Sequence, residues 1–469
     1  MADPTLKQLV ATLRSRPWMR RFLPPVDETA LAELEARLGS RLPPVIRSFY
    51  SELCGGEEDR GYLGILTLER ALPNAARLTL PIGPDREARV LFPVRERDDG
   101  PFEAVVCEGP LSDTIWLLDG SRVSAMPGVD GQPRQALDWL RATLEESARG
   151  MPAPIDGAAT QVNLAGLDLD AAPAELADAT SATSVSLAGN RLTDLPEALR
   201  RMPALEQLAI SDNQLTHLPA WIGDFALRSL NVSRNRLHAL PPSLRRLDKL
   251  VELMADGNHL EVLSTDGWSA LQTLSVAKNR IERIDGPGPL ALRTIDVGDN
   301  RLRELPNWIG ELPDLFELKL AGNPLRALPA SLEGASFSLV EIGALPSRSD
   351  AGAQPTWDWS AVFELLGSCE IDWLRIAGSP LAALPESARA LRRVRRLAIQ
   401  SAALTSLPEF VAELEELEEL WLDDNQLTSL PSAFAAHPRL RNIVLFANPI
   451  ERNELDRLRA SMPHVTIDG

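Results

Sequence analysis

The chain has 469 residues, more than one ordinary hydrophobic core supports, so we expect two or three domains or one domain joined to a repeat array. Its net charge is −18, and residues 1–150 carry 19 Lys and Arg against 23 Asp and Glu, which leaves −14 for residues 151–469. This acidic balance argues against nucleic acid or an anionic membrane as the partner of the C-terminal part. The 3 cysteines lack CxxC spacing, and neither a secretory signal nor a long apolar run is present, so we expect a cytoplasmic protein without a membrane span.

Residues 1–150 predict a small α+β domain. Asp27 and Glu28 precede leucines at helical spacing, which is typical of an N-capped amphipathic helix, and Gly39 stands where its C-terminal cap belongs. A second helix follows Pro43 and Pro44, with Ile46, Phe49 and Tyr50 on its inner side. Strands are expected at residues 90–94, 102–107 and 115–118, and a helix over 136–144 closes the domain.

The order of these elements is similar to the SUKH superfamily, which includes bacterial immunity proteins and yeast regulators of cell-wall synthesis. The matching residues are Leu34, Glu35, Leu38, Gly39, Leu42, Pro43, Phe49, Tyr50, Gly55 and Gly56. The family usually has asparagine before Gly-Gly, where this chain has Cys54. The resemblance implies a non-enzymatic module that binds another protein, often a toxin. Residues 151–158, rich in Pro and Ala, predict a linker.

From residue 159 onward one pattern returns every 21 to 23 residues, and the segment from Leu205 to Pro219 shows it in full: LEQLAISDNQLTHLP. The alternation within LxL is the period of a short strand with one buried face. One unit cannot bury its leucines alone, so we expect neighbouring units to stack. The LP half returns along the opposite face as an extended or single-turn segment.

This pattern, LxxLxLxxNxLxxLP, resembles the leucine-rich-repeat family, which implies an α/β horseshoe with parallel strands on its concave face. We expect the solenoid to span residues 159–462, with Val162–Pro173 as a degenerate first coil. Residues 449–469 form a C-terminal cap, in which Leu455 and Leu458 stand at helical spacing.

An asparagine recurs in the turn after each predicted strand. Its amide can both donate to and accept from backbone groups between coils, so removing one should cost about 1–3 kcal/mol. Ser379 and Ala402 occupy the same position in two coils, where we expect a weaker solenoid. The asparagines of this predicted ladder are Asn190, Asn213, Asn235, Asn258, Asn279, Asn300, Asn323, Asn425 and Asn448.

A longer interval between Asn323 and Ser379 predicts an insertion near residues 333–367. It contains a polar loop and then Trp357 and Trp359 at the start of a segment with helical spacing. Two interpretations stay open. The insertion shapes a binding face, or its tryptophans pack on the convex side.

Alternate residues of each strand point to the concave surface, where the late coils place tryptophan and arginine close together. These residue types are enriched at binding hot spots, so the sequence predicts a protein-binding patch. Alternatively, the side chains pack on each other or on the insertion. The candidate residues are Trp373, Arg375, Arg396, Glu419, Trp421, Asp423, Val444 and Phe446. The opposite charge runs Arg389–Arg396 and Glu413–Glu419 predict a solvated face on which they neutralise one another.

No catalytic motif stands out in the sequence. The 5 histidines lie outside any HExxH frame and are expected on the surface, and GK[ST] and GxSxG motifs are absent. We therefore expect no metal and no cofactor, and a monomeric, non-enzymatic protein–protein interaction scaffold. Bacterial immunity or signalling is its sharper form.

Two alternatives remain. One is a secreted bacterial leucine-rich-repeat effector, although a ubiquitin-ligase domain is not expected because the chain ends directly after the cap and Cys369 lies inside a coil. The other is a regulator of a small GTPase.

Overall fold

The computed structural model describes residues 25–53, 76–79, 88–96, 102–107, 114–119, 122–126, 134–142, 155, 157–344 and 357–469. The chain divides into two compact units: the first runs to Pro154 and includes Pro173–Glu175, and the second takes in Ile155–Ala172 and Leu176–Gly469. Cys54, Gly55, Gly56 and the predicted polar loop lie outside the described residues. Within the described ranges, no helix has both the length and the apolar character to cross a membrane.

The first unit begins with the predicted N-capped helix, α2 (Glu28–Leu38). The side chain of Asp27 accepts hydrogen bonds from the backbone N–H groups of Thr29 and Ala30, and Gly39 ends the helix with φ 70°. Helix α3 (Pro44–Ser48) continues into a π-helical turn, η1 (Phe49–Leu53). As predicted, Ile46, Phe49 and Tyr50 are buried.

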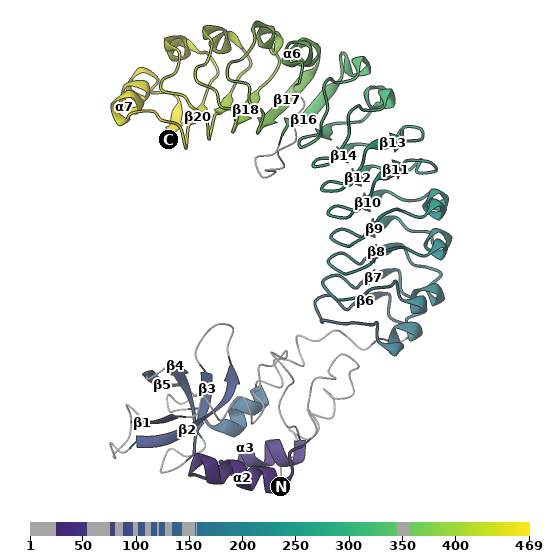
Figure 1. Cartoon of the computed structure of the whole chain (residues 1–469), viewed down its shortest axis with the longest axis vertical. Helices are drawn as coiled ribbons and strands as arrows, with labels where there is room; N and C mark the ends of the chain where they lie inside the picture. Colours follow the sequence, from purple (N-terminus) through teal and green to yellow (C-terminus); the bar gives the residue numbers. More distant parts are fainter. Residues whose placement is uncertain are drawn as a thin grey trace. The chain divides into compact units, whose positions relative to one another are not determined.

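An antiparallel sheet in the order β1-β2-β3-β4-β5 follows these helices (Figure 1). Its strands are β1 (Ala76–Thr79), β2 (Ala88–Glu96), β3 (Phe102–Val106), β4 (Ile115–Asp119) and β5 (Arg122–Ala125), of which β1 and β5 were not predicted. Residues 136–142 are helical. The indole Nε1 of Trp139 donates to the buried carboxylate of Glu103 at 2.8 Å, which joins this helix to β3.

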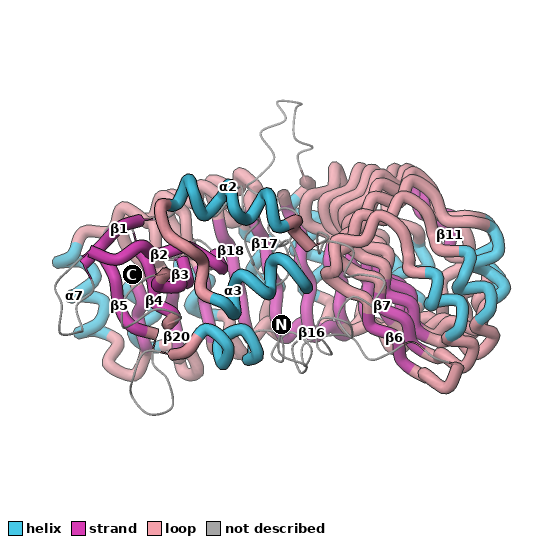
Figure 2. The backbone as a smooth tube through the Cα atoms, turned by 90° about the horizontal axis from the view of Figure 1, so that it is seen from below, coloured by secondary structure: helices cyan, strands magenta, loops and turns pink. Residues whose placement is uncertain are grey.

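The second unit is a solenoid with one parallel sheet of 14 strands along its inner face, and Figure 2 shows these strands side by side. In the three-residue strands the central side chain is buried and its two neighbours are more exposed, which is the period-2 pattern of a one-sided strand. The strands are β6 (Gln161–Asn163), β7 (Ser184–Ser186), β8 (Gln207–Ala209), β9 (Ser229–Asn231), β10 (Glu252–Met254), β12 (Thr273–Ser275), β14 (Thr294–Asp296), β15 (Glu317–Lys319), β16 (Ser336–Gly343), β17 (Glu370–Ala377), β18 (Arg396–Gln400), β19 (Glu419–Trp421), β20 (Asn442–Val444) and β21 (Thr466–Asp468).

The outer face consists mainly of 3₁₀ turns, most of which begin directly after the proline of an LP pair. Proline fixes φ and lacks an N–H group, so it suits the residue before such a turn. The turns are η3 (Ala174–Asp178), η4 (Glu197–Arg201), η5 (Ala220–Asp224), η6 (Pro242–Arg246), η7 (Asn307–Glu311), η8 (Ala330–Leu332), η9 (Glu386–Ala390), η10 (Glu409–Glu413) and η11 (Ser432–Ala436).

Two successive 21-residue repeats depart from this pattern. They lack the LP pair and carry on their outer side β11 (Val262–Ser264) and β13 (Arg283–Asp285), which pair in parallel. An extended segment rises farther per residue than a 3₁₀ turn, so fewer residues cross the same distance. The shorter repeat therefore corresponds to a change of outer-face structure.

Each ladder asparagine bridges two coils. In Asn279, Nδ2 donates to the carbonyls of Ala255 and Val276 at 2.9 Å each, while Oδ1 accepts from the N–H of Leu260 at 3.0 Å. The residue directly before the asparagine adopts a left-handed conformation, as Lys278 does with φ 55°. Glycine, aspartate, arginine, lysine or alanine occupies this position in different coils, so the turn imposes the conformation on whatever residue is present.

The coils without asparagine extend their strands. The hydroxyl of Ser379 still accepts from the N–H of Ala344 at 3.1 Å, whereas Ala402 contributes no polar side-chain atom. Here the pairing of β16, β17 and β18 continues to Gly343, Ala377 and Gln400. Ladder hydrogen bonds thus satisfy backbone groups that an amide satisfies elsewhere.

The insertion forms helix α6 (Trp359–Gly367), which lies in the outer layer beside η8 and η9 (Figure 1). Trp357 is buried, and the ring of Trp359 lies between those of Trp357 and Phe363, at centroid distances of 5.6 and 5.7 Å. The tryptophans of the insertion therefore pack on the convex side. At the C-terminal end, α7 (Arg452–Ser461) and β21 close the solenoid.

Candidate functional site

The strand register arranges the predicted residues in rows across neighbouring strands. Row 1 contains Trp373, Arg396, Glu419 and Asn442, and row 2 contains Arg375, Ala398, Trp421 and Val444. Asp423 and Phe446 lie two residues after row 2, in the turns that follow β19 and β20, and we call the positions two residues after row 2 in each coil row 3. We call the eight predicted residues Trp373, Arg375, Arg396, Glu419, Trp421, Asp423, Val444 and Phe446 the late concave patch. They come from β17–β20 and the turns that follow β19 and β20.

Trp373 is the centre of this patch. Its ring meets the ring of Trp421 edge to face, with centroids 5.3 Å apart and an interplanar angle of 70°. The guanidinium carbons of Arg375 and Arg396 lie 5.3 and 5.0 Å from the centroid of the Trp373 ring. Two cations and a second aromatic ring thus surround a single indole, an arrangement that holds the flat surfaces of long side chains in place.

Acidic residues outside the predicted set hold the two arginines. Arg375 pairs with Glu341 on β16 at 3.2 Å, and Arg396 pairs with Asp372, the residue before Trp373. Ala398 lies between Arg375 and Trp421 in row 2, and only 1% of its surface is exposed. A methyl group at this concave position leaves room for the two indoles to meet above it. The alternation of strand positions in the sequence identified the tryptophans, but it did not predict the acidic partners of the arginines or the role of Ala398.

The far end of the patch is apolar and open. Phe446 is 57% exposed, and Val444 is half-buried beside it on β20. A phenylalanine this exposed gains little from folding, because most of its ring stays in water. This end therefore offers apolar area that a partner can cover.

Four polar atoms of the same region have no hydrogen-bond partner among the described residues. They are Nε of Arg375, Nε1 of Trp421, Oδ1 of Asp423 and Oδ1 of Asn442. An unpaired buried polar atom costs about 1–3 kcal/mol, and native proteins contain few of them. Their concentration on β17–β20 distinguishes this surface from the earlier concave coils, where none occurs in the described residues.

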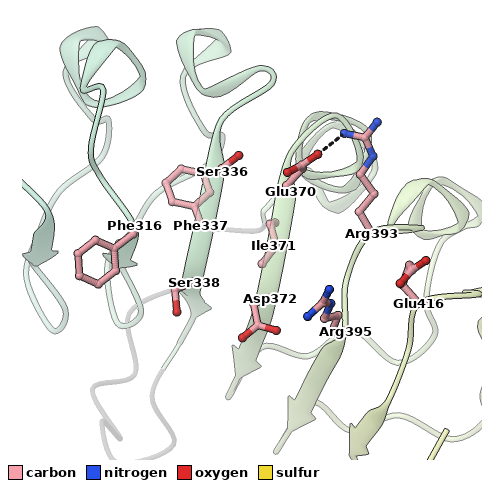
Figure 3. A pocket seen from close by; sticks show the side chains of 10 residues that line it. All are labelled: Phe316, Ser336, Phe337, Ser338, Glu370, Ile371, Asp372, Arg393, Arg395 and Glu416. Atoms are coloured by element: carbon pink, nitrogen blue, oxygen red, sulfur yellow. Dashed lines mark hydrogen bonds and ion pairs between the residues drawn. The ribbon is translucent and has the colours of Figure 1, made fainter. Parts of the chain in front are cut away.

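A second hollow lies at the amino ends of β15–β19, with a volume of about 520 Å³ (Figure 3). Phe316, Phe337 and Ile371 line it together with charged side chains, and Glu370 pairs with Arg393 at 3.1 Å. Both members of that pair are more than half exposed, so it contributes little to stability. Its charges are of both signs, which gives this hollow no preference for one sign of ligand.

The two charge runs neutralise one another only in part. Arg389 does pair with Glu413, but Arg393 pairs with Glu370 and Arg396 with Asp372 in the preceding coil, while Glu416 pairs with Arg439 in the following coil. The prediction that the runs face each other was therefore incomplete, because the arginines also reach back by one coil.

The histidine prediction was wrong for His437. This residue occupies a core position and is 3% exposed. Its Nε2 lies 3.1 Å from the carbonyl of Leu414, and Nδ1 accepts from the N–H groups of Arg439 and Leu440. These bonds define the neutral tautomer with the proton on Nε2, so His437 is a structural residue. Among the described residues, no group of three His, Cys, Asp or Glu side chains is placed to hold a metal ion.

Two stretches of the repeat array match known family models. Residues 180–237 and 416–436 match family models described as leucine rich repeat. Similar solved structures include a leucine-rich-repeat protein of Leptospira interrogans, with 22% identity over 67% of this chain and 96% of that chain and a TM-score of 0.42. An internalin of Listeria monocytogenes has 17% identity over 66% of this chain and 87% of that chain, with a TM-score of 0.48. YopM, an effector protein of Yersinia pestis, has 23% identity over 70% of this chain and 85% of that chain, with a TM-score of 0.42. No curated protein sequence matches the chain.

Proposed function

We propose that this leucine-rich-repeat solenoid is a protein-interaction scaffold and that the late concave patch is its binding surface. One observation carries the proposal: Trp373 stands on the concave face beside two guanidinium groups and in edge-to-face contact with the ring of Trp421. Clustered Trp and Arg side chains provide large contact areas, and their mutual packing reduces the entropy lost on binding. Exposed Phe446 extends the same surface with apolar area.

The internal packing of the patch supports this role. The two tryptophans pack on each other, as one alternative from the sequence held, while the described helix of the insertion, α6, lies on the convex side. Nε1 of Trp421 is buried and has no hydrogen-bond partner among the described residues. A partner that rotates this indole would give its N–H group an acceptor, and the binding energy would then include relief of that cost.

The first unit supports a more specific proposal for the biological role of the scaffold. Its helix pair with buried Ile46, Phe49 and Tyr50, followed by an antiparallel sheet, is compatible with the SUKH-like module that the sequence resembles. We propose on this basis a cytoplasmic bacterial immunity or signalling protein. Secreted effector and small-GTPase regulator are the second candidates, and the identity of the bound partner decides among them.

The test is comparative capture of partners from native lysate. Wild type is compared with Trp373→Ala/Trp421→Ala and with Gln207→Ala/Thr273→Ala, a control on row 1 of the early coils. We expect the tryptophan variant to lose a partner that the control retains, with equal folding by circular dichroism. Equal capture by all three proteins would reject the patch as the binding surface.

A further inference from the structure

The charges of the concave face follow a simple rule. Its basic side chains in rows 1–3 of the described strands are Lys319, Arg375 and Arg396, and each pairs with an acid. Lys319 pairs with Glu317 at 3.3 Å, Arg375 with Glu341 at 3.2 Å, and Arg396 with Asp372. No basic charge of these rows is left over for a partner.

Several carboxylates of the same rows, in contrast, have no basic partner among the described residues. The carboxylates of rows 1–3 without an ion pair among the described residues are Glu252, Asp256, Asp296, Glu419, Asp423 and Asp468. They extend from β10 to β21, and two of them, Glu419 and Asp423, belong to the late concave patch. Some accept hydrogen bonds, such as Asp256 from the hydroxyl of Ser275 at 2.6 Å, but hydroxyl donors leave the negative charge in place.

Asp423 gives the excess of acidic charge a defined position beside the tryptophans. Gln400 donates to one carboxylate oxygen, Oδ2, at 2.9 Å, while Oδ1 is buried without a hydrogen-bond partner in the part of the chain that the structure describes. Asp423 follows Trp421 by two residues, so the unpaired carboxylate oxygen lies next to the aromatic cluster. Because Oδ1 is buried, a cationic donor would reach it once the carboxylate turns toward the concave surface, and the alkyl stem of that donor would lie against the tryptophans.

Repulsion between neighbouring carboxylates on the concave face also favours a cationic partner. Burial raises the pKa of Asp296, and the neighbouring carboxylates Asp256 and Glu341 raise it further, against the lowering effects of the Gly298 N–H group and Lys319. Like charges on one surface repel, and a cation brought among them relieves that repulsion.

We infer that the partner presents a basic, Lys- or Arg-containing polypeptide segment to the concave face, with an apolar residue for the Phe446 end. The inference rests on the proposed function and adds the sign of the partner's charge. A segment along the strands' inner surface places its cations near Glu419, Asp423 and Asp468 while its apolar side chain covers Phe446.

The experiment measures binding of a labelled peptide of alternating Lys and Leu to the full chain at low salt. It compares wild type with the concave variant Glu419→Gln/Asp423→Asn/Asp468→Asn. The control, Glu311→Gln/Glu364→Gln/Glu409→Gln, removes the same charge from exposed acids of the convex elements η7, α6 and η10. We expect about tenfold weaker binding for the concave variant and little change for the control.

Equal weakening in both variants would overturn the inference, because binding would then follow net charge alone. Stronger binding of a matched Glu/Leu peptide would overturn it as well. The lysate capture separates this inference from the proposed function. A partner lost from Trp373→Ala/Trp421→Ala but retained by the concave charge variant, and unaffected by 0.5 M salt, would leave the binding surface intact and reject the basic partner.

Discussion

The rings of Trp373 and Trp421 meet edge to face at 5.3 Å although β18 lies between their strands. Neighbouring strands are about 4.8 Å apart, and Trp421 stands one row beyond Trp373, so two strand spacings and a two-residue offset separate the Cα atoms. On the intervening strand, Ala398 lies beside Trp421 in row 2, and its methyl group is too small to keep the two indoles apart. A larger side chain at 398 would separate the two halves of the patch.

The asparagine ladder predicts a cost of substitution that depends on burial. Asn279 and Asn448 make matching bonds, since Asn448 donates to Leu422 and Leu445 at 2.9 and 3.0 Å, but Asn279 is 2% exposed and Asn448 is half-buried at the cap. We expect Asn279→Ala to lower the free energy of unfolding by about 1–3 kcal/mol and Asn448→Ala by less, because water reaches the groups left at the cap. Urea denaturation of both variants measures this, and equal losses would contradict it.

The left-handed residue before each asparagine predicts opposite effects of two substitutions. Ala447 has φ 56° and Gly189 has φ 67°, and an added Cβ on Gly189 meets its nearest atom at 3.5 Å, so only backbone strain is at issue. Ala447→Gly should raise the melting temperature and Gly189→Ala should lower it, each through a change of about 1 kcal/mol. A melting temperature unchanged by either substitution would show that the turn accommodates Cβ without strain.

His437 predicts loss of stability below neutral pH. Burial lowers its pKa below the ordinary 6.5, with a smaller lowering from His464 and an opposing effect from the Leu414 carbonyl. The unfolded chain therefore takes up a proton first, and stability falls as pH drops from about 6.5 to the lowered pKa of the folded state. His437→Leu should remove this part of the pH dependence in thermal denaturation between pH 5 and 8. A wild-type profile that is matched by the variant would exclude His437 as the cause.

Asp296 predicts a pH dependence of stability opposite in sign to that of His437. Because its folded-state pKa is raised above 3.8, the ionised form carries a cost that grows as pH rises from 3.8 to the raised value and is complete above it. Asp296→Asn keeps an acceptor for the Gly298 N–H group and should stabilise the chain at pH 7. The gain should shrink as pH approaches 4. Exposed Asp314→Asn serves as the control, and an Asp296→Asn effect that is constant over this pH range would contradict the account.

Much of the fold was predictable because its signals are local and repeated. The LxL alternation located the strands around Leu208 and Leu420, and the Asp27 cap and Gly39 located a helix in the first unit. Strands β11 and β13 were missed, since their only sequence signal is the loss of LP in two 21-residue repeats. The left-handed turn position was missed because residues as different as Gly189 and Arg234 occupy it.

The candidate site was predictable as a set of positions but not as an arrangement. Strand alternation brought Trp373, Trp421 and Phe446 to one face. Their supports depend on distances between coils: Glu341 belongs to a strand 34 residues before Arg375, and the intervening insertion breaks the repeat from which a register would be counted. The sequence alone gave no interval from which to predict that pair.

The central claim is tested most directly by replacing single residues with a photo-crosslinking amino acid and irradiating the protein in native lysate. The positions are Val444 in the late concave patch, Ser186 on the early concave face and Glu409 on convex η10. The account predicts a crosslinked protein partner from position 444 and none from position 409. Crosslinks from 409 or 186 with none from 444 would contradict it and assign partner binding to another surface.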